Sequence, residues 1–156
     1  MHDVAAPFFV TARSGATIGS LTVDRLTATG VYRSAASVEG WAEEPVGRVA
    51  VRDATIEYAG GGAAEDAARV VKTPGVDARP LPAWGLYARH VKRVDLDNVR
   101  LDVDKPDARP AVLCDGVGSL KIDTLKAAGD VSKALSLRDV GEVRTDDPAL
   151  HGEGKR

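Results

Sequence analysis

The chain has little cysteine, few aromatic residues and almost no side-chain amides. Its 156 residues include one cysteine, Cys114, one asparagine, Asn98, and no glutamine, and aromatic residues make up 4%. A single cysteine excludes an internal disulfide framework and a zinc site built on cysteines. No apolar run approaches the roughly 20 residues that a membrane-spanning helix needs, so we expect no membrane partner. The segment MHDVAAPFFV lacks a basic region before an apolar stretch, so the sequence predicts no secretory signal there.

Neither sign of charge dominates the chain. The formal net charge is −2, and 28% of the residues are charged. This balance argues against long disordered segments and against a nucleic-acid partner, which would require excess positive charge. Hydrophobic residues make up 44%, which is enough for one domain with a core. Valine is abundant, with 20 residues against three isoleucines, and 16 glycines accompany it; this composition favours short strands joined by turns.

A short apolar pattern recurs along the chain. An apolar residue is followed by two others, an apolar residue, one other and a third apolar residue. The copies lie at 18–23, 46–51, 91–96 and 117–122, with a degraded copy at 140–145. Successive copies begin 28, 45, 26 and 23 residues apart. The spacing of 45 is either two turns of a shorter repeat or one turn that carries an insertion.

Each copy of the pattern is flanked by further strand-like pieces. Alternating apolar pairs follow the first four copies, and short apolar segments precede the last three, at 86–90, 112–116 and 135–139. An alternation of period two predicts strands with one buried face. Repeats of about 20–30 residues with several short strands predict an all-β fold, a right-handed parallel β-helix (solenoid) of about five to six coils over residues 1–145. A β-sandwich is the alternative, although it does not require the same pattern to return in register.

One segment breaks this rhythm. Residues 60–83 hold three consecutive glycines, several prolines and no alternating strand, so we expect an irregular insertion with a short helix at 63–71. Glu65 and Asp66 would lie in the first turn, where the helix dipole favours acidic side chains. The glycines lack the Lys-Ser/Thr pair of a phosphate-binding loop, so we interpret them as a turn. Residues 146–156 are expected to form a polar C-terminal tail.

Residues with catalytic potential are sparse. The three histidines are far apart, and no motif matches a metal or nucleotide site, so the sequence predicts no metal and no cofactor. Cys114 falls on an apolar strand position and is expected in the core rather than as a nucleophile. The carboxylate pairs Glu43–Glu44 and Asp146–Asp147 lie outside the repeat strands, and we interpret them as solvated turns rather than as the acid pair of a glycosidase.

Most of the remaining potential lies in the segment that directly follows the insertion. Trp84 and Tyr87, beside Arg89 and His90, offer rings for stacking on a sugar and polar groups for hydrogen bonds to it. These four residues form the predicted carbohydrate-binding set. The alternative is that Trp84 and Tyr87 only pack the insertion onto the strands. The sequence leaves both interpretations open.

Three runs within residues 43–122 carry a family resemblance. They read EEPVGRVAVRDATIEYAGGGAAEDAARVV, LPAWGLYARHVKRVDLDNVRL and KPDARPAVLCDGVGSLKI. They resemble the C-terminal coils of bacterial proteins similar to glycoside hydrolase family 28, the polygalacturonase-like family. The resemblance implies a right-handed parallel β-helix and a pectic polysaccharide or oligosaccharide as partner. It also implies that full-length relatives are exported.

The chain departs from this family in its catalytic motifs. The family's residues lie in an Asn-Thr-Asp motif, an Asp-Asp pair, a Gly-His-Gly motif and an Arg-Ile-Lys motif. The three motifs are absent, and Asp146–Asp147 lies at the wrong end of the chain to be the pair. No catalytic residue is therefore carried over. The first hypothesis is the C-terminal β-helix part of such a hydrolase, inactive alone.

Two further hypotheses remain open. One is a stand-alone carbohydrate-binding or structural β-solenoid, and the other is a hydrolase with an unrecognised carboxylate pair. The sequence begins inside a repeat, with Phe8, Phe9 and Val10 almost at its start. An uncapped first coil exposes strand edges and apolar surface. We therefore expect self-association through this N-terminal coil.

Overall fold

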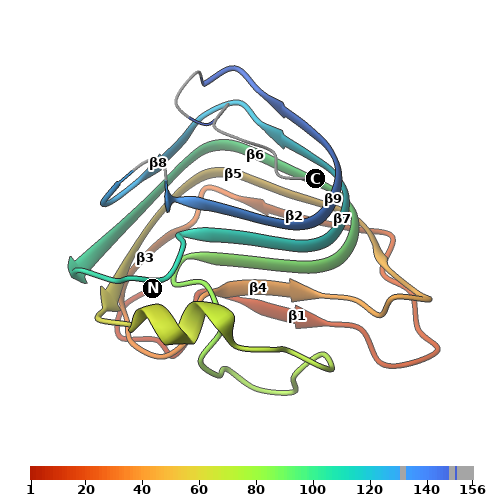
Figure 1. Ribbon diagram of the computed structural model, residues 1–156, viewed down its shortest axis with the longest axis horizontal. Helices are drawn as coiled ribbons and strands as arrows, with labels where there is room; N and C mark the ends of the chain where they lie inside the picture. The colour runs from red at the N-terminus through yellow and green to blue at the C-terminus, as the bar shows by residue number, and fades with distance from the viewer. Residues whose placement is uncertain (131–132, 148–149, 151–156) are drawn as a thin grey trace.

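The computed structural model describes residues 1–130, 133–147 and 150, which form one curled sheet of parallel strands (Figure 1). The strands are β1 (Phe9–Thr11), β2 (Ser20–Asp24), β3 (Thr27–Val31), β4 (Ala36–Glu39), β5 (Val46–Gly60), β6 (Leu86–Lys105), β7 (Val112–Ile122), β8 (Leu125–Ala127) and β9 (Leu135–Thr145). The 3-10 helix η1 (Ala64–Ala68) lies between β5 and β6. The prediction of an all-β chain is confirmed. The closed right-handed β-helix and its number of coils remain predictions.

The strands stack in three columns, because the long strands bend and contribute to more than one column. Stack A contains residues 9–11, 36–39, 86–89, 112–115 and 135–138. Stack B contains residues 20–24, 48–52, 93–97, 119–122 and 142–145. Stack C contains residues 27–31, 54–60, 99–105 and 125–127.

The bends between stacks depend on residues with left-handed backbone. At the bend between stacks A and B, His90, Gly116 and Asp139 have φ of 49°, 65° and 48°. At the bend between stacks B and C, Asp53 and Asn98 have φ of 50° and 52°, and Asn98 Nδ2 donates a hydrogen bond to Asp53 Oδ1 at 2.7 Å. Asn, Asp and His tolerate this region better than other side chains do. The bends therefore use glycine and polar residues in left-handed conformation, and Arg25, with φ of 55°, holds the equivalent place between β2 and β3.

The apolar repeat of the sequence matches the register of the sheet, because equivalent positions of successive copies are paired. Leu21, Val49, Val94, Leu120 and Val143 hold the middle apolar position of the five copies, and each is the Cα partner of the next. The side chains of the first four point into the curl and pack in one continuous apolar core, whereas Val143 is 38% exposed. Stacking equivalent positions in this way buries apolar surface along the whole sheet.

The spacing of 45 residues carries one insertion. Val46 and Val91, the first positions of two successive copies, are direct Cα partners, so the interpretation as two turns of a shorter repeat is wrong. The extra residues lie between the end of β5 at Gly60 and the start of β6 at Leu86. The predicted insertion at 60–83 agrees with these bounds.

Glycine recurs inside the repeat because neighbouring backbones approach closely there. A Cβ on Gly118 would lie 2.6 Å from the carbonyl oxygen of Lys92, and one on Gly141 would lie 2.6 Å from that of Gly118. A Cβ on Gly47 would come still closer to the carbonyl oxygen of Gly19. Real Cβ atoms do not reach such distances without movement of the backbone. The close approach of neighbouring backbones thus accounts for glycine at these positions, while Lys92 stands at the equivalent position of the copy at 91–96.

The insertion covers the outer side of stack A, opposite the core (Figure 1). Ala35, Leu81, Ala83, Tyr87 and Leu113 form a second buried cluster there, with Val71 packed against it. The helix η1 is shorter than the predicted 63–71. It starts where Asp66 Oδ2 accepts a hydrogen bond from the Ala63 amide at 3.1 Å, and the chain is extended again at Arg69. The two β-branched valines that follow disfavour helix.

Cys114 is fully buried in the core, as predicted, and burial raises the pKa of its thiol to about 12. No helix of the described residues is long and apolar enough to cross a membrane. Of the predicted tail at 146–156, only residues 146, 147 and 150 are described, so most of that prediction lies outside the described residues.

Candidate functional site

The four residues of the predicted carbohydrate-binding set share one short segment at the start of β6 but not one surface. Trp84 points toward the core, and Tyr87 points to the opposite side, beneath the insertion. Arg89 lies on the same outer side as Tyr87, and His90 lies at the bend between stacks A and B. The structure therefore brings Tyr87 and Arg89 together and separates them from Trp84.

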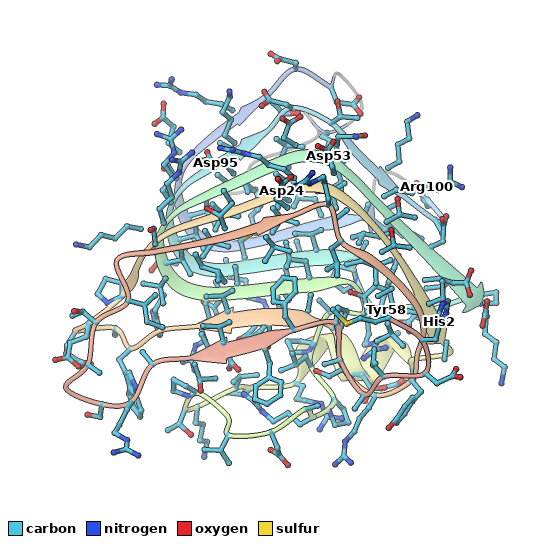
Figure 2. All side chains as sticks on the ribbon, turned by 180° about the vertical axis from the view of Figure 1, so that it is seen from behind. His2, Asp24, Asp53, Tyr58, Asp95 and Arg100 are labelled. Carbon is cyan, nitrogen blue, oxygen red and sulfur yellow. The ribbon has the colours of Figure 1, made fainter. Side chains whose placement is uncertain are left out.

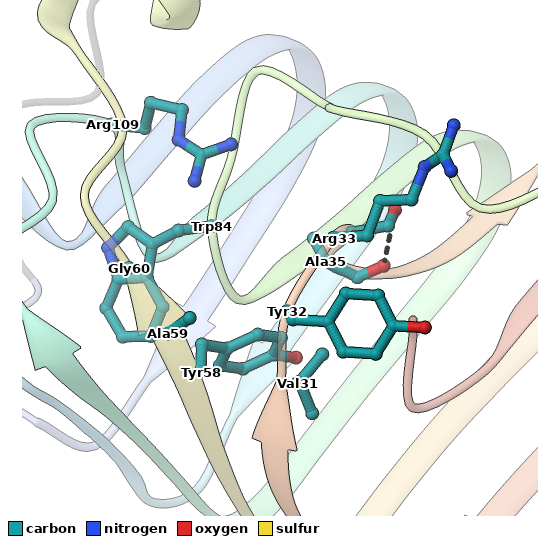
Figure 3. A pocket seen from close by; sticks show the side chains of 10 residues that line it. Val31, Tyr32, Arg33, Ala35, Tyr58, Ala59, Gly60, Trp84 and Arg109 are labelled. Carbon is teal, nitrogen blue, oxygen red and sulfur yellow. Dashed lines mark hydrogen bonds between the residues drawn. The ribbon is translucent and has the colours of Figure 1, made fainter. Parts of the chain in front are cut away.

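Trp84 is 4% exposed and packs edge-on against Tyr58, with ring centroids 5.7 Å apart and planes at 74°. The Tyr58 hydroxyl donates to the Gly85 carbonyl at 2.5 Å, and burial raises its pKa, so it stays protonated. A cavity of about 30 Å³ opens beside this pair, between Tyr32 and Arg109 (Figure 3). That volume holds a water molecule or two, not a sugar ring.

Tyr87 is 1% exposed and packs with Leu113 and with Leu81 of the insertion. Burial is also the main reason why the pKa of its hydroxyl is raised. Neither Trp84 nor Tyr87 offers a ring face to solvent: Tyr87 packs against the insertion, whereas Trp84 packs in the core. The sugar-stacking role of the two rings remains a prediction, and it would require the insertion to move.

A charged row crosses the outer side of stack A under the insertion. Glu39, Arg89, Asp115 and Arg138 are successive Cα partners, so their charges alternate up the stack. Arg79 of the insertion donates to Glu39 Oε1 at 2.7 Å. At the other end of the row, Arg138 Nη2 donates to the carbonyl of residue 67 in η1 at 2.6 Å. The row therefore fastens the insertion to the sheet.

The sequence itself carries a signal for this row. The strand pieces at 86–90, 112–116 and 135–139 each carry a charged residue in fourth place, namely Arg89, Asp115 and Arg138. The fourth charged residue, Glu39, lies in β4, a strand that the sequence did not predict. Charge alternation across copies of a repeat predicts a ladder of side chains on one face.

His90 lines an open groove of about 460 Å³ along the bend between stacks A and B. Lys92 and Asp139 lie in the same groove, and Pro45 forms part of its wall. Burial, followed by the positive charge of Arg89, lowers the pKa of His90, against the opposing effect of nearby carboxylates. At neutral pH the imidazole is therefore uncharged and can both donate and accept a hydrogen bond. Of the predicted set, His90 is the member that lines a groove large enough for a sugar.

The outer side of stack B carries a second charged surface, missed as a site by the sequence analysis. Asp95, labelled in Figure 2, accepts hydrogen bonds from two arginines. Arg48 Nε donates at 2.8 Å and Arg93 Nε at 3.0 Å. Burial raises the pKa of Asp95, but the hydrogen bonds from the two arginines outweigh it and hold the pKa below its ordinary value. Arg52 and Lys121 line the same groove of about 250 Å³. The period-two alternation of the sequence had predicted only that these strands bury one face.

The carboxylate pair Glu43–Glu44 lies between β4 and β5, outside the strands. Glu44 Oε2 accepts a hydrogen bond from the Gly15 amide at 2.6 Å, so it joins two loops. Within the described ranges, no group of three or more His, Cys, Asp and Glu side chains could hold a metal ion. Comparisons with protein-family models, with curated proteins and with solved structures found no match.

Proposed function

We propose that this chain is the C-terminal β-helix part of a polygalacturonase-like protein, and that it binds an acidic pectic polysaccharide without cleaving it. The observation that carries the proposal is the register: five copies of one apolar pattern stack in parallel, as the coils of a β-helix would. The resemblance of residues 43–122 to the polygalacturonase-like family supplies the class of polysaccharide. The absence of that family's catalytic motifs from the sequence supports binding without turnover.

The chemistry of the outer side of stack B fits an acidic polysaccharide. A pectic chain presents one carboxylate on each uronate unit, and guanidinium and ammonium groups bind carboxylates through charge-assisted hydrogen bonds. Arg52 and Lys121 lie in one groove with Arg48 and Arg93. Three carboxylates, those of Asp95, Asp97 and Asp123, line the same groove, so cations exceed anions there by one, and Lys121 pairs with Asp123 at 3.3 Å. Asp95 holds Arg48 and Arg93 in fixed orientations, which lowers the entropy lost on binding.

The groove at the bend between stacks A and B, lined by His90, Lys92 and Asp139, is called the corner groove, and it adds groups suited to sugar hydroxyls. It adjoins stack B at its start, where Lys92 and Gly118 directly precede the strand segments. The neutral imidazole of His90 can accept a hydrogen bond from one hydroxyl, and Asp139 can accept from another. We therefore propose that the polysaccharide contacts stack B through cations and the corner groove through His90.

Titration calorimetry with oligogalacturonate tests binding, and reducing-end release from polygalacturonate tests turnover. We expect measurable binding with no turnover. The double variant Arg52→Ser and Lys121→Ser should weaken binding at least tenfold, because each loses a cation in the groove. The control variant Lys126→Ser removes a cation from the outer side of stack C and should bind as the wild type does.

Two results would contradict this proposal in different ways. Clear release of reducing ends by the purified chain would leave the third hypothesis, a hydrolase with an unrecognised carboxylate pair. No binding by a folded chain would leave a purely structural β-solenoid. Tyr87→Phe removes only a hydroxyl; unchanged binding in this variant would exclude that hydroxyl from the contact set.

A further inference from the structure

The charged row under the insertion contains buried polar atoms without a hydrogen-bond partner. They are Glu39 Oε2 and the Nε and Nη1 atoms of Arg89. The Glu39 side chain is 0% exposed, and Arg89 is mostly buried. Buried groups of this kind are paired in nearly all native proteins, because leaving them unpaired forfeits their hydration. The two side chains therefore point to a binding partner at this place.

The positions of the two residues define the site. Glu39 and Arg89 are Cα partners on neighbouring strands and face the same outer side of stack A. The other Glu39 oxygen is already bonded to Arg79 of the insertion. The Arg89 Nε atom lies 4.0 Å from Asp115 Oδ2, which is too far for a hydrogen bond. Glu39 and Arg89 thus remain close to one another without a direct ion pair.

The charges of the surrounding side chains limit which chemical group can lie between Glu39 and Arg89. A cation would face Arg79, Arg89 and Arg138, and an anion would face the carboxylates of Glu39 and Asp115. The occupant must donate to a carboxylate oxygen and accept from a guanidinium N–H, which is the chemistry of a neutral hydroxyl. Water is the smallest compound with this chemistry. We propose that Glu39 and Arg89 form a buried water site that bridges the sheet and the insertion.

This water site acts as a latch, meaning a polar contact that holds the insertion closed against the sheet. Water that bridges Glu39 and Arg89 satisfies both groups, and Arg79 connects Glu39 to the insertion. Arg138 forms the second contact, at η1. If the insertion opened, Glu39 would lose its hydrogen bond from Arg79, and the water would be exposed to solvent. Residence of the water and closure of the insertion are therefore coupled.

Two measurements test the site directly. A crystal structure should show a water oxygen at about 3 Å from both Glu39 Oε2 and an Arg89 donor. Oxygen-17 relaxation dispersion should detect a long-lived water that is lost in Arg89→Met, which removes the donors and keeps the chain length. A direct ion pair between Glu39 and Arg89 with no water, or an unchanged dispersion in Arg89→Met, would overturn the proposal.

Amide hydrogen exchange of residues 61–83 tests the latch. We expect exchange there to accelerate at least tenfold in Arg89→Met and in the milder variant Glu39→Gln, which weakens the contact with Arg79. The matched control is Arg100→Met, which removes a guanidinium paired with Asp102 on the outer side of stack C. Equal exchange in all three variants and the wild type would contradict the coupling. If Arg89→Met does not fold, Glu39→Gln alone decides the result.

Discussion

At the residue scale, the glycines of the repeat make the sharpest stability prediction. Gly118→Ala places a Cβ 2.6 Å from the carbonyl oxygen of Lys92, and this neighbour is backbone, which cannot swing away. We expect the free energy of unfolding to fall by about 2 kcal/mol, the usual range for overpacking. Urea denaturation followed by circular dichroism measures the change.

Gly19→Ala is the matched control, because Gly19 stands in the same column with nothing within 4 Å of its would-be Cβ. We expect its free energy of unfolding to change by less than about 0.5 kcal/mol. If Gly19→Ala and Gly118→Ala lowered the free energy of unfolding equally, the loss would come from the different backbone preferences of glycine and alanine. The close approach of neighbouring strands would then not be its cause.

The thiol of Cys114 should be inert in the folded chain. Burial raises its pKa to about 12, so at pH 8 almost no thiolate is present, and the side chain lies inside the core. We expect labelling by a disulfide reagent at pH 8 to proceed only as fast as the chain unfolds. The urea-unfolded chain, with an ordinary thiol, is the positive control. Rapid labelling of the native chain would contradict the buried position.

Individual residues differ in how far the sequence determines their role. Cys114 was predictable because it lies at an apolar position of a period-two pattern. The burial of Tyr87 was not, because it depends on where the insertion folds back, and no local pattern encodes that contact. Glu39 was missed for the same reason: its partner Arg79 lies 40 residues away in the sequence.

At the scale of elements, one pair of residues fastens both ends of the insertion. Asp107 Oδ2 accepts from the Gly62 amide at 2.9 Å and from Arg109 Nη2 at 2.7 Å. Arg109 Nη1 donates to the Leu81 carbonyl at 3.1 Å. The pair therefore joins the start and the end of the insertion to the turn after β6. Burial raises the pKa of Asp107, but the hydrogen bonds from Arg109 and Gly62 outweigh it, and the pKa lies below its ordinary value.

This pair predicts part of the acid sensitivity of the fold. Because the pKa of Asp107 is lower in the folded than in the unfolded chain, its contribution to stability is present above about pH 4. The contribution is lost as the pH falls through the folded pKa. Asp107→Asn should lower the free energy of unfolding at pH 7 by about 2 kcal/mol, typical of hydrogen bonds to a charged group, and should flatten the pH dependence below pH 4.

The control for this prediction is Asp102→Asn, which breaks an exposed ion pair with Arg100. Exposed pairs of this kind contribute about 0–1 kcal/mol, so a small change is expected. Urea denaturation between pH 3 and pH 7 measures both variants. A pH dependence of Asp107→Asn as steep as that of the wild type would contradict the assignment.

Elements were predictable where the repeat determines them and not elsewhere. The strands of stack B follow from the apolar pattern, since each copy must present the same side chains to the core. The short helix was located correctly but expected to reach Val71, because sequence periodicity gives no sharp end to a helix of five residues. The bends at His90 and Asn98 carry no glycine, so their left-handed backbone was not visible in the sequence.

At the scale of the whole molecule, the curled sheet has an edge at its N-terminal side. In stack A, β1 pairs with β4, and in stack B, β2 pairs with β5; within the part of the chain that the structure describes, neither edge strand has a second partner. Apolar side chains of these strands, such as Val10 and Leu21, pack against the core but remain only partly buried. Unpaired parallel edges with apolar flanks are templates for pairing with another chain.

The chain should therefore self-associate through this edge. We expect sedimentation velocity to show a weight-average mass that rises with concentration between about 1 and 100 μM, an affinity range typical of weak interfaces. Phe9→Lys should shift this rise to at least tenfold higher concentration, because Phe9 is 41% exposed on β1 and a charge there opposes edge pairing. Tyr32→Lys makes the same kind of change at a residue that is 63% exposed and lies beyond the end of β3, and it should associate as the wild type does. A wild-type chain that remains monomeric over the whole range would show that the described edge is not the surface that joins two copies. An equal shift in both variants would mean that general surface charge, rather than strand pairing, controls the association.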